Sequence, residues 1–82
     1  MFDQLKQMKQ LRDFLREIAA HRVTMEESGV SVVMRGDFAV EKITLNSALD
    51  TGALERTLLR LLTQAREKIQ RDLTARLSQK SG

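Results

Sequence analysis

Few side chains in this sequence are placed for covalent chemistry. The single histidine, His21, has no serine or carboxylate at a spacing that would form a catalytic pair, which favours a surface or helix-capping role. Glu26 and Glu27 are adjacent in a strand-like run, where neighbouring side chains point to opposite faces and cannot act as an acid–base pair. The chain has no cysteine and its glycines are isolated, which excludes thiolate metal sites and glycine-rich phosphate loops. The pattern predicts a binding module with no cofactor and no enzymatic activity.

The basic residues are better organised than these groups. Lys and Arg number 14 against 11 Asp and Glu, a net charge of +3, so their placement is more informative than their total. Arginines on rigid helices suit bidentate contacts with phosphate groups. Two helical faces carry most of them, and the candidates for phosphate contact are Lys6, Lys9, Arg12, Arg16, Arg56, Arg60, Arg66, Lys68, Arg71 and Arg76.

Charge placement alone leaves two interpretations open. Solvated helix faces with pairs of opposite charge would carry the same residues. If the ligand is a nucleic acid, the absence of Trp and Tyr opposes stacking on single-stranded bases. No helix-turn-helix, zinc-finger or basic-zipper pattern is visible. We therefore expect a duplex backbone, bound by shape and charge with weak base preference.

Two helices must carry the basic faces. Residues 3–20 predict the first, because apolar side chains recur at steps of three and four: Leu5, Met8, Leu11, Leu15 and Ile18. Residues 51–78 predict the second, with Asp50 or Thr51 as its cap. Its apolar stripe consists of Leu54, Leu58, Leu61, Leu62, Ala65, Ile69 and Leu73.

An alternating pattern between the helices predicts three strands in an antiparallel meander. Gly29 and the pair Gly36-Asp37 mark the two tight turns. The third strand is expected from Phe38 to Leu45, and its apolar parity changes near Glu41-Lys42, which predicts a bulge.

The second helix is too long for one small domain. About 28 residues reach roughly 40 Å, whereas a compact domain of this size spans about 30 Å. Its apolar arc covers about 160°, more than the roughly 100° that packing on one sheet needs. We expect a second copy to cover the excess, although the first helix could fill it within one chain. The candidate interface residues are Leu59, Leu62, Ile69, Leu73 and Leu77.

Chain length bounds the rest of the interpretation. The 82 residues allow one domain, and without disulfides or a metal its stability favours association. No apolar run of about 18 residues and no signal-peptide core is visible, so the expected location is the cytoplasm, without membrane contact.

Four segments, taken in their order along the chain, indicate a protein family. They are Lys6-Gln7-Met8-Lys9-Gln10-Leu11, Arg22-Val23-Thr24-Met25-Glu26-Glu27-Ser28-Gly29, Val30-Ser31-Val32-Val33-Met34-Arg35-Gly36 and Val40-Glu41-Lys42-Ile43-Thr44-Leu45-Asn46. A long helix with Leu54-Glu55 and Ala65 follows. In this order and spacing the chain resembles, over nearly its whole length, the YbaB/EbfC family of nucleoid-associated proteins.

The resemblance implies an α+β fold of order α-β-β-β-α, with one YbaB-like domain over residues 1–82. It further implies a homodimer joined through strands and helices, and binding of double-stranded DNA through projecting helical arms at the nucleoid. The alternative hypothesis is a protein–protein adaptor that makes no direct contact with DNA. Charge reversal at Arg56 and Arg60 separates the two hypotheses.

Overall fold

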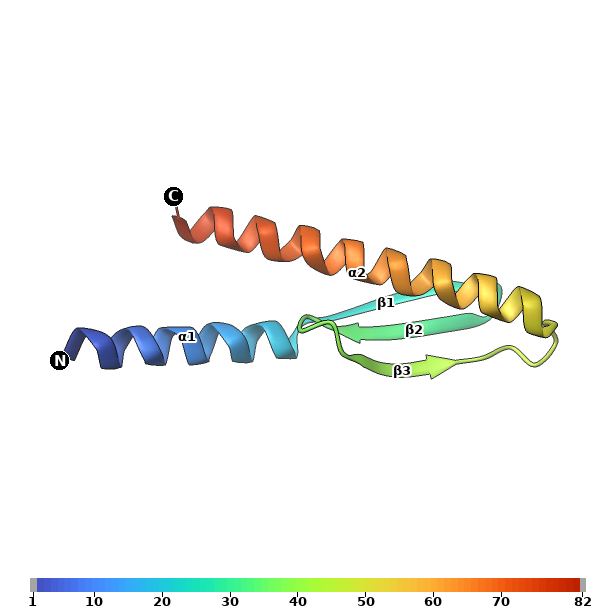
Figure 1. The fold of residues 1–82 in the computed structure, drawn as a ribbon, viewed down its shortest axis with the longest axis horizontal. Helices are drawn as coiled ribbons and strands as arrows, with labels where there is room; N and C mark the ends of the chain where they lie inside the picture. The colour runs from blue at the N-terminus through green and yellow to red at the C-terminus, as the bar shows by residue number, and fades with distance from the viewer. Residues whose placement is uncertain (1, 82) are drawn as a thin grey trace.

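The computed structural model describes residues 2–81, and the side chains of residues 3–79. Five elements follow one another: α1 (Phe2–Ala20), β1 (Arg22–Glu27), β2 (Val30–Arg35), β3 (Val40–Thr44) and α2 (Thr51–Ser81) (Figure 1). The strands form one antiparallel sheet in the order β1-β2-β3. The predicted α-β-β-β-α order and meander are confirmed.

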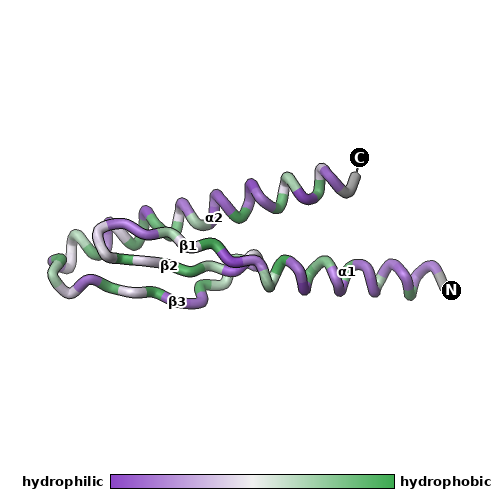
Figure 2. The backbone as a smooth tube through the Cα atoms, turned by 180° about the vertical axis from the view of Figure 1, so that it is seen from behind, coloured by the Kyte–Doolittle hydropathy of each residue, from purple (hydrophilic) through white to green (hydrophobic). Residues whose placement is uncertain are grey.

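The molecule is elongated. It measures 59 × 21 × 14 Å, and its radius of gyration of 16.8 Å exceeds the roughly 12 Å of a compact domain of this length. α1 continues in line with β1, and the second half of α2 extends beyond the sheet in the same direction (Figures 1 and 2). The predicted projection of the second helix is therefore confirmed, and α1 projects as well.

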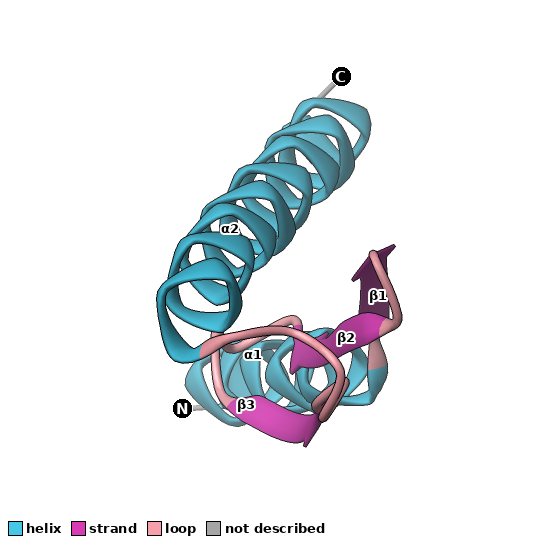
Figure 3. Cartoon of the chain, turned by 90° about the vertical axis from the view of Figure 1, so that its right-hand side faces the viewer, coloured by secondary structure: helices cyan, strands magenta, loops and turns pink. Residues whose placement is uncertain are grey.

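The core lies between α2 and one face of β1 and β2 (Figure 3). Strand alternation points every second side chain towards the helix, and α2 meets this face with residues spaced at three to four positions. The buried apolar side chains are Val23, Val30, Val32 and Met34 from the strands, and Leu61, Ala65 and Ile69 from α2. Leu54, Leu58, Leu62 and Leu73 pack around them. The predicted apolar stripe of the second helix is thus the core stripe.

The first hairpin closes with two left-handed residues, Ser28 (φ 54°) and Gly29 (φ 77°), a turn that matches the twist of paired strands. The Asn46 side chain donates a hydrogen bond through Nδ2 to the Ser28 carbonyl at 2.9 Å. Its Oδ1 accepts from the Ala48 amide at 3.0 Å. Asn46 therefore fastens the hairpin to the loop that leads into α2.

The third strand begins later than the sequence indicated. Phe38 lies in the turn with φ 69°, and its amide donates to the Arg35 carbonyl at 2.9 Å, so the strand starts at Val40 rather than Phe38. The expected bulge is present. Lys42 pairs with Val33 and Val40 with Met34, which leaves Glu41 as the extra residue.

The cap of α2 is Asp50. Its Oδ1 accepts a hydrogen bond from the Ala53 amide at 2.7 Å, which satisfies one of the free amides of the first turn. Thr51, the other candidate, is the first helical residue.

Gly36 sits where α1 meets the β2–β3 turn, and it yields the first prediction. A Cβ there would overlap the backbone carbonyl of Ile18, which cannot move like a flexible side chain. We expect Gly36→Ala to lower the free energy of unfolding by about 2–3 kcal/mol, measured by urea denaturation. Gly52→Ala is the matched control: its Cβ would meet only side-chain atoms of Arg56 and Asp50, at 3.4 and 3.5 Å, so stability should stay level or rise slightly. Equal effects of the two variants would contradict this account.

Candidate nucleic-acid interface

The basic side chains of α1 form an exposed flank on a projecting helix. Lys6, Lys9, Arg12 and Arg16 are all exposed. None of the four makes an ion pair with another residue whose side chain is described. Their charges are therefore open to solvent and to an anionic ligand.

The basic side chains of α2 are exposed but partly paired within the chain. Arg56, Arg60, Arg66, Lys68 and Arg71 all face solvent. Arg60 lies 3.5 Å from Glu27 on β1, and Lys68 lies 3.9 Å from Asp72 one turn further along the helix. These exposed pairs are weak, so an anionic ligand could compete with them.

Arg76 differs from the other candidates. Its side chain is half-buried and lines two small depressions beside His21, at the junction of α1 with the sheet. Arg76 is therefore less accessible than the five exposed basic side chains of α2.

The five apolar residues expected at an interface fall into three groups. Ile69 is fully buried in the core of the single chain, because it faces β1 and β2, so it serves the fold. Leu62 and Leu73 are half-buried against that core. Leu59 and Leu77 remain 59% and 54% exposed.

An exposed apolar surface also lies on α1, where the sequence analysis had named no interface residue. The α1 stripe, which consists of Leu5, Met8, Leu11 and Leu15, is 55–66% exposed. α1 touches the sheet only near its C-terminal end, where Ile18 meets Gly36. Three more apolar side chains, Val40, Ile43 and Leu45, are exposed along β3 and just after it. The helical periodicity identified the stripe but not that more than half of each of its side chains stays exposed.

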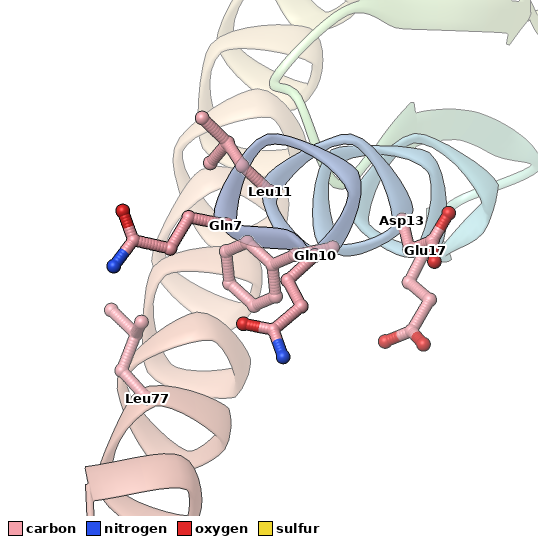
Figure 4. A pocket seen from close by; sticks show the side chains of 7 residues that line it. Gln7, Gln10, Leu11, Asp13, Glu17 and Leu77 are labelled. Carbon is pink, nitrogen blue, oxygen red and sulfur yellow. The ribbon is translucent and has the colours of Figure 1, made fainter. Parts of the chain in front are cut away.

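A groove separates the two projecting helices. It encloses about 770 Å³ between Leu77 of α2 and a wall of α1 formed by Gln7, Gln10, Leu11, Asp13, Phe14 and Glu17 (Figure 4). α1 and the end of α2 therefore line one open groove.

Two guanidinium–carboxylate pairs balance the charge at the end of the sheet near α1. Arg22 and Arg35 are cross-strand neighbours, and like charges in that position repel. Arg22 Nε donates to Glu41 at 2.6 Å, while Arg35 binds Asp37 through two bonds of 2.6 and 3.1 Å. These bonds favour the ionised carboxylates and lower the pKa of Glu41 and of Asp37 below their ordinary values.

His21 makes a long-range contact that its sequence position did not suggest. Its Nε2 lies 2.9 Å from Asp72 Oδ2, although 51 residues separate the two in the chain. This hydrogen bond is the main cause that sets the Asp72 pKa below its ordinary value of 3.8; nearby cations lower the pKa further, and partial desolvation opposes them. On a helical wheel Asp72 falls inside the apolar arc of α2, a signal in the sequence that this carboxylate faces inward.

Other functional classes find little support in the described part of the chain. Among residues whose side chains are described, no three His, Asp or Glu side chains gather as a metal site. No helix within the described residues is long and apolar enough to cross a membrane.

Fold and surface together define a class: a small α+β module with two projecting helices, each bearing exposed basic side chains. The comparison with family models identifies the particular family. Residues 1–82 match the YbaB/EbfC DNA-binding family, and the chain belongs to this family of non-enzymatic DNA-binding proteins. Neither the curated proteins nor the solved structures contain a match.

The lowered carboxylate pKa values predict how stability responds to acid. A carboxylate whose pKa is lower in the folded state stabilises the fold above its unfolded pKa, and this contribution disappears as pH falls through the folded pKa. For Asp37 and Glu41 the ordinary pKa values are 3.8 and 4.5. The urea concentration at the unfolding midpoint should therefore decrease once the pH drops below about 5.

Glu41→Gln should lower the midpoint at pH 7 and make its decline in acid shallower. Glu55→Gln is the control, because it removes an exposed carboxylate without an ion pair among the described residues. Identical pH profiles for Glu41→Gln and the unmodified protein would show that the Arg22–Glu41 pair does not contribute.

Proposed function

We propose that this protein is a non-enzymatic, nucleoid-associated protein that binds duplex DNA as a homodimer, mainly through phosphate contacts from its basic helical arms. Membership in a DNA-binding family supports the choice of ligand. The observation that carries the binding mode is that α1 presents two unpaired surfaces side by side. One is its exposed apolar stripe, and the other is the unpaired basic flank.

The apolar stripe supports association. A helix that is isolated from its neighbours is marginal in water, because packing of an apolar face supplies most helical stability in proteins. α1 has 19 residues, and each side chain of its stripe is more than half exposed. A second copy can supply that partner in a two-fold arrangement, where the same patch is buried on both chains. Leu59 and Leu77 of α2 are further candidates for this interface.

The basic flank supports phosphate binding. Its four cations lie on the same helix as the stripe, so pairing two copies would place two such flanks in one assembly. Exposed cations that neutralise phosphates release counterions from the duplex, which makes affinity depend steeply on salt. No base-reading element follows from this arrangement, so we expect weak sequence preference.

The first test of this proposal is fluorescence anisotropy with a labelled random duplex at several salt concentrations. We expect the logarithm of affinity to fall linearly with the logarithm of salt, with a slope of about 0.9 per phosphate contact. Arg12→Glu with Arg16→Glu should reduce affinity at least roughly tenfold and flatten the slope by about two to four contacts per dimer. Arg56→Glu with Arg60→Glu tests the exposed basic side chains of α2 in the same way.

Lys42→Glu is the control on the sheet; because it reverses one charge, it is compared with the single reversals Arg12→Glu and Arg56→Glu on the helices. Circular dichroism must show each variant folded. Unchanged affinity in both double reversals would reject the basic arms as the binding surface. No binding by the unmodified protein at low salt would leave the protein–protein adaptor as the function.

The second test concerns the dimer. Leu11→Glu places a charge in the middle of the α1 stripe and should shift the sedimentation coefficient from dimer to monomer at micromolar concentration. Gln10→Glu adds the same charge one position away, in the wall of the groove rather than in the stripe, and should leave the dimer intact. A dimer that survives Leu11→Glu, or a monomeric unmodified protein, would refute the proposed interface.

A further inference from the structure

His21 lies at the point where the first arm joins the rest of the chain. It follows the last residue of α1 and precedes the first of β1. Its amide donates to the carbonyls of Glu17 and Ile18, both at 3.1 Å, and its own carbonyl accepts from the Gly36 amide at 2.8 Å. The backbone of His21 therefore connects the end of α1 to the β2–β3 turn.

The side chain of His21 connects the same point to the second arm. Its Nε2 contacts Asp72 at 2.9 Å, and the two side chains are 29% and 31% exposed. This hydrogen bond bridges the α1–β1 junction and α2. Beyond this contact the groove opens between the helices. One polar contact thus lies at the vertex of the two projecting arms.

We propose that His21 is a positioning residue for DNA binding: through Asp72 it fixes the angle between α1 and α2, and protonation of its imidazole tightens that angle. The link to DNA rests on the function proposed above, whereas the control of the angle does not. The ionised Asp72 carboxylate can only accept, so Nε2 must carry a hydrogen. Protonation makes this a charge-assisted bond, which is shorter and stronger.

The charged groups around His21 have opposing effects on that protonation. From α2, Asp72 favours the imidazolium and Arg76, which lines the same depressions, opposes it. From α1, Glu17 lines one of these depressions and favours it. Arg22 follows directly in β1, but Glu41 binds it, and Lys68 of α2 faces Asp72 at 3.9 Å. Arg35 and Asp37 flank Gly36 and bind each other.

The chain's only histidine makes the contact directly measurable. A long-range ¹H–¹⁵N spectrum should show a single imidazole with its hydrogen on Nε2 at neutral pH. A hydrogen on Nδ1 alone would overturn the contact with Asp72. This measurement involves no DNA, so its result is independent of the proposed function.

The angle between the arms can be measured by electron–electron double resonance. The chain has no cysteine, so Gln10→Cys on α1 and Thr74→Cys on α2 accept two spin labels, with excess unlabelled protein to suppress distances between copies. We expect a broader distance distribution in His21→Ala and in Asp72→Ala. His21→Gln, which keeps a side-chain donor, should restore the distribution, and Glu67→Gln on the exposed face of α2 should not change it. An unchanged distribution in His21→Ala would overturn the proposal.

The DNA readout is affinity against pH at constant ionic strength, between about pH 5.5 and pH 8, the range in which histidine titrates. The unmodified protein should bind roughly two- to fivefold more tightly at the acid end, the size expected for one exposed charge interaction. His21→Gln should match it at pH 8 and lack the gain in acid. A variant with altered arm distances but unchanged affinity and pH profile would reject the positioning role.

Discussion

The packing of α2 on the apolar face of β1 and β2 is the interaction on which the rest of the structure depends. Leu61, Ala65 and Ile69 meet a strand face that includes Val30 and Val32, and all five are essentially excluded from water. Each fully buried Val, Leu or Ile contributes about 1.5–3 kcal/mol relative to exposure. This contact fixes the direction of α2, and its length then carries the helix past the sheet. The asymmetric position of α2 over β1 and β2 also leaves the apolar side chains of β3 exposed.

A single copy of this chain buries little of its apolar surface outside that contact. The α1 stripe and the side chains of β3 lie on elements with few internal neighbours, and the molecule is elongated. Small domains without disulfides or metals are commonly stabilised by association. The same elongation separates fold from function, because the core occupies one end and the exposed cations of α1 occupy the other. Substitutions in the basic flank of α1 can therefore change binding while leaving the core intact.

Several charged residues near the sheet are paired with the opposite charge. Three arginines are matched with carboxylates there: Arg22 with Glu41, Arg35 with Asp37 and Arg60 with Glu27. Along α1, the cations have no such partners among the described side chains. The modest net charge of +3 therefore understates the local positive charge of the first arm. The His21–Asp72 contact lies between these two regions, where the arms meet.

The sequence by itself determined the elements, because helix and strand periods and the glycine turns are local properties of the chain. It predicted both helices to within a few residues, the bulge at Glu41 and the apolar stripe of α2. It also misplaced the start of β3 by two residues, since the left-handed turn at Phe38 depends on two hydrogen bonds: the Phe38 amide donates to the Arg35 carbonyl, and the Ala39 amide donates to the Asp37 carboxylate. Only the tertiary structure decided which apolar residues are buried in the core and which stay exposed. Ile69 and Leu77 are two helical turns apart on the apolar side of α2. Only Ile69 faces the sheet, because the sheet ends before α2 does. The His21–Asp72 contact likewise exists only because the fold brings together two residues 51 positions apart, a distance over which periodicity carries no information.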